Sequence, residues 1–150
     1  MNNILFPTEF SHENKKAFGK LLVFAKSMGA KIRLFHQVPN PIDPILTSGA
    51  VMFGGGSVYL GAYLKEETIA LQKQAHRWVA RGEKLGVQVD FKILPRGRGV
   101  VDSIIKESKS AKSDLVAMST GTGTIESVII GSFTRQVVRS SEAPVWVIRA

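Results

Sequence analysis

Apolar positions along the chain follow two alternating spacings. Short apolar or alternating runs, typical of buried strands, cover residues 4–7, 31–38, 87–94, 114–118 and 145–148. Between them, apolar residues recur every three or four positions, the period of an amphipathic helix. This β-α-β-α-β-α-β-α-β order predicts right-handed crossovers and a parallel sheet with helices on both faces, which is a three-layer α/β sandwich.

The first predicted helix has the clearest boundaries. Ser11 can cap its N-terminus, Glu13 lies in its first turn, where the helix dipole favours negative charge, and Gly29 supplies a stop. Its apolar stripe is expected to face the sheet and consists of Phe18, Leu21, Leu22, Ala25 and Met28.

A long connection at about residues 39–59 interrupts the pattern. It holds three prolines and the run Gly54-Gly55-Gly56, and a helix is expected to begin only at Leu60. Connections of this length in a compact domain are usually a lid, a binding loop or a disordered segment. The whole chain, residues 1–150, is expected to form one domain that includes this connection.

Composition narrows the class of protein. The 150 residues contain no cysteine, which excludes disulfides, thiolate nucleophiles and Cys-ligated metals. No basic leader precedes an apolar core, and no run approaches the roughly 20 apolar residues that span a bilayer. We therefore expect a cytoplasmic protein without membrane insertion.

The formal net charge of +8 suggests an anionic binding partner, such as nucleic acid, an anionic membrane or a phosphate-bearing ligand. However, the basic residues are dispersed over every element, with no run of five and no interleaved aromatic residues of the kind that stack bases. A solvated basic surface is favoured over a specific nucleic-acid site.

The segment after the fourth predicted strand is rich in glycine, threonine and serine. Gly131 and Ser132 fall at a predicted helix N-terminus, where free amides and the helix dipole favour an anion. It is not a Walker A loop, because Gly-Lys-Ser/Thr is absent. The same composition also suits a turn that simply needs glycine geometry.

Several segments together resemble the universal stress protein family. Residues 4–11 are similar to its opening strand and turn, 25–37 to its first helix end and second strand, and 113–118 and 144–149 to its last two strands. The resemblance implies a five-stranded parallel sheet of order 3-2-1-4-5, Rossmann-like and similar to the adenine nucleotide alpha hydrolases. It also implies a stress-response regulatory module that binds ATP, with Mg²⁺ only as a companion of ATP.

The resemblance implies a nucleotide-binding site in this chain. Nucleotide-binding members carry Gly-x-x-Gly, nine residues, then Gly-Ser/Thr, and Gly121, Gly131 and Ser132 fit that pattern. The residues implied are Thr8, Glu9, Gln37, Met118, Gly121, Thr122, Gly123, Gly131, Ser132 and Phe133.

Three of these positions depart from the family pattern. Met118 replaces the first glycine and is expected to put a side chain where the family's backbone approaches the nucleotide. Thr122 replaces a frequent basic residue, and Glu9 replaces the usual aspartate. The alternative is therefore a dimeric interaction module of the same fold that binds no nucleotide.

Arg96 and Arg98 follow the third predicted strand and could supply positive charge toward an anionic ligand, or could be exposed loop residues. The three histidines show no metal-binding spacing, and His36 is expected to be a satisfied core or strand-end residue. No Gly-x-Ser-x-Gly elbow is present. We expect no catalytic or metal site, and at most slow ATP hydrolysis.

The last strand would lie at the edge of a sheet in the family's order. An exposed apolar edge invites pairing with a second copy. We therefore expect a homodimer through Val145–Ile148.

Overall fold

The computed structural model describes residues 1–38, 56–95, 97, 99–120 and 131–149, with the side chains of residues 56–64 outside the description. Within this part of the chain, strands and helices alternate. The strands are β1 (Asn3–Pro7), β2 (Lys31–Gln37), β3 (Val89–Leu94), β4 (Leu115–Ser119) and β5 (Val145–Ile148). The helices are α1 (His12–Met28), α3 (Gly56–Lys84), α4 (Val100–Ser110) and α5 (Ser132–Ser140).

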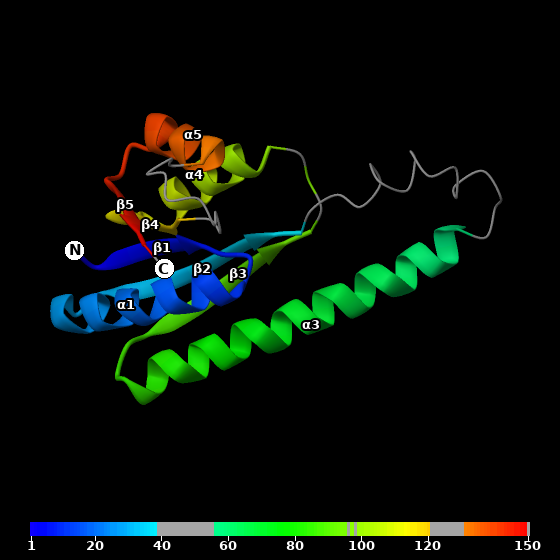
Figure 1. Ribbon diagram of the computed structural model, residues 1–150, viewed down its shortest axis with the longest axis horizontal. Helices are drawn as coiled ribbons and strands as arrows, with labels where there is room; N and C mark the ends of the chain where they lie inside the picture. The colour runs from blue at the N-terminus through cyan, green and yellow to red at the C-terminus, as the bar shows by residue number, and fades with distance from the viewer. Residues whose placement is uncertain (39–55, 96, 98, 121–130, 150) are drawn as a thin grey trace.

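The five strands form one parallel sheet in the order β3-β2-β1-β4-β5. The central strand β1 pairs with β2, where Pro7 lies opposite Phe35, and with β4, where Leu5 lies opposite Val116. Helices α1 and α3 lie on one face of the sheet and α4 and α5 on the other (Figure 1). The predicted three-layer α/β sandwich and its strand order are confirmed.

Two hydrophobic cores separate the helices from the sheet. The first, between the sheet and α1 and α3, contains an aromatic cluster in which Phe18 stacks against Phe6 and Trp78, with ring centroids 6.0 and 4.7 Å away. The second lies beneath α4 and α5 and contains Phe35 and Met118. Successive residues of each strand therefore pack in opposite cores, as expected for a sheet covered on both faces.

The ends of α1 lie where the sequence predicts them. The hydroxyl of Ser11 accepts a hydrogen bond from the Asn14 amide, and Gly29 ends the helix in the left-handed conformation, at φ 62°. Met28 was wrongly predicted as a core residue, since it is 48% exposed. It lies in the last turn, beyond the residues that pack on the sheet.

Helix α3 begins earlier than predicted. It starts at Gly56 rather than Leu60, so the predicted 39–59 connection is shorter than expected, and residues 39–55 lie outside the described part. The helix begins at the last residue of the glycine run, so the apolar spacing counted from Leu60 placed its start about one turn too late. In Figure 1 the N-terminal part of α3 extends beyond the sheet.

A buried carboxylate connects α4 to the sheet. Glu107 is 3% exposed and bonds to Arg33 Nη1 of β2, at 3.0 Å from its Oε1, and to Lys92 Nζ of β3. Arg33 also forms an ion pair with Asp90, its neighbour on the adjacent strand β3, with 2.8 Å between Nε and Oδ1. The hydrogen bond to Asp90, followed by that to Glu107, raises the pKa of Arg33. Two cations thus neutralise one buried charge.

Candidate functional site

The candidate site lies at the carboxyl edge of the sheet, between the ends of β1 and β4. The chain leaves β1 toward α1 on one face, and α5, which follows β4, lies on the opposite face (Figure 1). Such a reversal of strand order leaves a crevice outside the strand ends, where open α/β sheets bind ligands.

The turn after β1 is held by its own side chains. The buried Thr8 donates its backbone N–H to the Phe35 carbonyl, 2.9 Å, and its hydroxyl accepts from the Phe10 amide, 2.9 Å. Phe10 adopts a left-handed conformation, φ 58°, which turns the chain sharply into α1. Glu9 is exposed, and no ion pair occupies its carboxylate among the described residues.

Asn14 connects this turn to the end of β4. Its Oδ1 accepts from the Glu9 amide, 2.8 Å, and from the Thr8 hydroxyl, 3.1 Å, while its Nδ2 donates to the Ser119 hydroxyl. Sequence reasoning missed both Asn14 and Ser119. The available signal is that Asn14 is the third residue after the Ser11 cap, a position whose side chain commonly reaches back to the preceding backbone.

Replacing Asn14 by alanine is expected to destabilise the protein and loosen the crevice. The change removes the hydrogen-bond partner of the Glu9 amide and of the Ser119 hydroxyl, and the acceptor of the Thr8 hydroxyl, which should lower the free energy of unfolding by about 1–3 kcal/mol. Urea denaturation measures the loss. Asn2→Ala is the matched control, because the Asn2 side chain is exposed. Equal stability of the two variants would contradict the bridging role of Asn14.

The end of β2 supplies two buried polar residues. His36 Nδ1 donates to the Thr8 carbonyl at 2.7 Å, which confirms the expectation of a satisfied strand-end histidine. Gln37 is 7% exposed, and its Oε1 is the one buried side-chain polar atom without a partner among the described residues. A side chain at position 97 would collide with Gln37 Nε2, so Gly97 permits this placement.

Met118, near the end of β4, is 4% exposed and packs in the second core with Leu5, Phe35, Ile104, Val116 and Val137. Core packing therefore accounts for its side chain. Truncating it to glycine would leave a cavity as well as altering the strand end.

Helix α5 begins at the same edge. Gly131 is its N-cap and is exposed, as are Ser132 and Phe133. No side chain caps this end among the described residues, and the first turn contains no acidic residue. The amides of the first turn are thus available to an anion.

The predicted residues Gly121, Thr122 and Gly123 lie outside the described residues, as do Arg96 and Arg98. Of the predicted site residues, the structure brings Thr8, Glu9, Gln37, Met118, Gly131, Ser132 and Phe133 to the carboxyl edge or directly beneath it.

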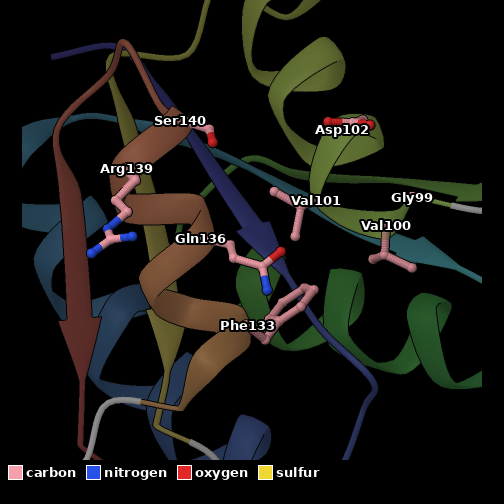
Figure 2. A pocket seen from close by; sticks show the side chains of 8 residues that line it. All are labelled: Gly99, Val100, Val101, Asp102, Phe133, Gln136, Arg139 and Ser140. Atoms are coloured by element: carbon pink, nitrogen blue, oxygen red, sulfur yellow. The ribbon is translucent and has the colours of Figure 1, made fainter.

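A pocket of about 440 Å³ lies between α4 and α5. Phe133 and Gln136 point from α5 toward Val101 of α4 (Figure 2). Val100 and Gly99 line the end of the pocket that lies nearest the carboxyl edge of the sheet. Sequence reasoning singled out Phe133 but missed the α4 side, because the adjacency of α4 and α5 is set by the strand order.

The described part of the chain offers neither a metal site nor a membrane-spanning helix. It holds no cluster of three His, Asp or Glu side chains that could bind a metal ion. None of its helices combines the length and apolarity that crossing a bilayer would require.

Comparison with known families decides the assignment. The sequence model of the universal stress protein family matches residues 1–149. The chain belongs to the universal stress protein family. A comparison with curated protein sequences found no match.

Several solved structures share the fold. Hypothetical protein MJ0577 superposes with a TM-score of 0.74 at 21% identity, covering 99% of this chain and 96% of that one. The Archaeoglobus fulgidus universal stress protein in complex with dAMP gives 0.66 at 18% identity, with 99% and 97% covered. A universal stress protein in complex with cAMP gives 0.65 at 15% identity, with 98% and 95% covered.

Proposed function

We propose that this universal stress protein is a stress-response regulatory module that binds an adenine nucleotide, ATP, at the carboxyl edge of its sheet. The observation that carries the proposal is the uncapped, acid-free start of α5 beside the crevice between β1 and β4. A helix N-terminus at a topological switch point suits the phosphates of a nucleotide. Relatives of the same fold that bind dAMP and cAMP support the adenine nucleotide class.

The described residues fit such a ligand in two respects. Ser132 is exposed and offers a hydroxyl and a backbone amide at the helix start, and Glu9 is exposed on the opposite side of the crevice. The buried Gln37 carboxamide has an acceptor, Oε1, that no donor of the described residues satisfies. In the proposed site Gly131 and Ser132 bind phosphate, Thr8 and Glu9 flank the ribose, and Mg²⁺ enters only with ATP. The role is regulation through binding, and we assign no reaction.

Thermal unfolding with ATP, ADP and AMP, each at millimolar concentration and fixed salt, tests the proposal. A ligand present at 100 times its Kd stabilises the folded state by about 2.7 kcal/mol, which raises the Tm by about 5–10 °C for a chain of this size. An unchanged Tm with all three nucleotides would favour the alternative, an interaction module that binds no nucleotide.

We also propose that β5 pairs with β5 of a second copy. It is an edge strand, and the bonds from Val116 N to Pro144 O and from Thr120 N to Ile148 O direct the even-numbered carbonyls toward β4. The peptide groups of Val145 and Val147 therefore face outward, where a partner strand can bind them.

Val147→Pro removes one outward N–H while keeping the bonds to β4, since proline is tolerated where an edge strand faces solvent. We expect light scattering to report a dimer for the unsubstituted protein and a folded monomer for the variant. A variant that remains dimeric would place the contact elsewhere.

A further inference from the structure

The layer formed by α1 and α3 carries most of the protein's excess positive charge. These two helices hold nine lysine and arginine residues against four glutamates, which leaves +5 of the formal net charge of +8. Helices α4 and α5, on the other side of the sheet, hold four basic and two acidic residues, which leaves +2. Basic residues that are dispersed along the sequence are therefore concentrated on one side of the folded protein (Figure 1).

The cations of this layer form no ion pairs within the described part of the chain. The ion pairs found there lie in β2, β3, α4 and the turn after α5, and none of them includes a residue of α1 or α3. The positive potential of this side is thus not cancelled locally, so an anionic surface would be attracted to it.

The exposed cations of α3 form a stripe along its outer side. Lys73, Arg77 and Lys84 are spaced by four and seven residues, which places them on one face of a helix. All three are exposed, whereas Trp78 is buried in the first core. Ile69, four residues before Lys73, continues the stripe and is 43% exposed. The outer side of α3 therefore combines positive charge with an exposed aliphatic side chain.

Helix α1 adds to the same surface. Lys16 and Val23 lie about two turns apart on its outer side, and Val23 is 69% exposed, more than any other large apolar residue of the described chain. Arg81 of α3 connects the two helices, because its Nη1 donates to the Lys15 carbonyl at 3.2 Å. Gly19 leaves room for this guanidinium, since a Cβ there would lie 2.8 Å from Nη2. The two helices therefore present one basic and partly apolar surface.

This combination of side chains selects among the possible polyanions. At a lipid surface, cations meet anionic head groups while aliphatic side chains enter the boundary between head groups and acyl chains. A single-stranded nucleic acid would instead be held by aromatic side chains that stack on its bases. The described side chains of α1 and α3 include no exposed Phe, Tyr or Trp. A lipid surface is therefore the better match.

We propose that the outer side of α1 and α3 docks on an anionic lipid surface. Lys73, Arg77 and Lys84 lie against the head groups, and Val23 and Ile69 enter the boundary beneath them. The contact is peripheral and reversible. It does not depend on nucleotide binding, because the start of α5 lies on the other side of the sheet.

Co-sedimentation of the unsubstituted protein with vesicles tests the proposal. Vesicles of phosphatidylcholine alone are compared with vesicles containing about one third phosphatidylglycerol, each at about 50 and about 300 mM salt. The protein should bind only the anionic vesicles and should lose most of that binding at the higher salt. Equal binding to both kinds of vesicle, or binding to neither at the lower salt, would refute the proposal.

A triple variant removes the α3 stripe, by Lys73→Gln, Arg77→Gln and Lys84→Gln. Each lysine or arginine near an anionic surface strengthens binding about fivefold, so this variant should bind anionic vesicles about 100-fold more weakly. Its thermal transition should be unchanged, because all three positions are exposed.

The matched control makes the same change of net charge on the other layer, by Lys106→Gln, Arg135→Gln and Arg139→Gln at exposed positions of α4 and α5. It should bind anionic vesicles to within a few-fold of the unsubstituted protein. Equal losses in the two triple variants would mean that only net charge matters, and would overturn the assignment to this surface.

Val23→Ser tests the apolar part of the contact. Removing the exposed valine side chain should weaken vesicle binding about fivefold. A final arm replaces the vesicles with a single-stranded RNA homopolymer, which offers phosphates without an apolar layer. Unchanged vesicle affinity in Val23→Ser, or binding to RNA in the absence of vesicle binding, would contradict a lipid partner.

Discussion

Replacing Ser132 by glutamate is expected to abolish nucleotide binding while leaving the protein as stable as before, or slightly more stable. Ser132 is the first residue of α5 and is exposed, so a longer side chain fits. A carboxylate in the first turn interacts favourably with the helix dipole, by about 0.3–1 kcal/mol. The same charge repels phosphate, and like charges brought together at a binding site cost several kcal/mol, so ATP affinity should fall about 100-fold or more.

Two variants separate the charge effect from the rest. Ser132→Gln has the size of the glutamate without its charge, and Ser140→Glu adds the same charge at the opposite end of α5. Calorimetry should show that both retain ATP binding to within a few-fold of the unsubstituted protein, although Ser140→Glu should be slightly less stable. If Ser132→Glu binds ATP as well as Ser132→Gln does, the phosphates do not lie at the start of α5.

The second large effect concerns the buried carboxylate of Glu107. Arg33→Met or Lys92→Met alone leaves one cation beside it, so each should lower the free energy of unfolding by about 1 kcal/mol. The double variant leaves an uncompensated buried charge, and its loss should reach about 3–5 kcal/mol. The two substitutions should therefore be strongly non-additive, as residues that share one partner are.

Urea denaturation of the four proteins in this cycle measures the coupling. The exposed pair between Lys109 and Glu142 provides the control, since its side chains are 56% and 75% exposed and Lys109→Met should change stability by only about 0.5 kcal/mol. A double variant whose loss equals the sum of the single losses would show that Glu107 does not depend on the two cations for compensation.

Local signals in the sequence were enough for much of the fold. Ser11 and Gly29 act at the ends of α1 through groups within a few residues, so their roles could be predicted without tertiary information. Apolar periodicity located all five strands, with errors of no more than two residues at any end and none for β5. Periodicity did not locate the start of α3, because its apolar stripe becomes recognisable only at Leu60, and it did not identify Met28 as exposed.

Contacts between distant segments account for what sequence reasoning missed at the site. The Asn14–Ser119 bridge joins residues 105 positions apart, and nothing local to either residue specifies it. From the sequence alone, Glu107 would be taken for a surface residue of an amphipathic helix. It is buried between two cations because α4 packs over β2 and β3. The resemblance to the family predicted Gln37 as a site residue, but the burial of its Oε1 without a partner among the described residues follows from the packing around β2.

The central claim is that ATP binds at the carboxyl edge of the sheet, and calorimetric titration of ATP into the unsubstituted protein at fixed ionic strength tests it most directly. The account predicts a saturable heat with one site per chain, lost in Ser132→Glu and retained in Ser132→Gln. The absence of saturable binding at millimolar ATP, with a protein shown to be folded by its thermal transition, would contradict it.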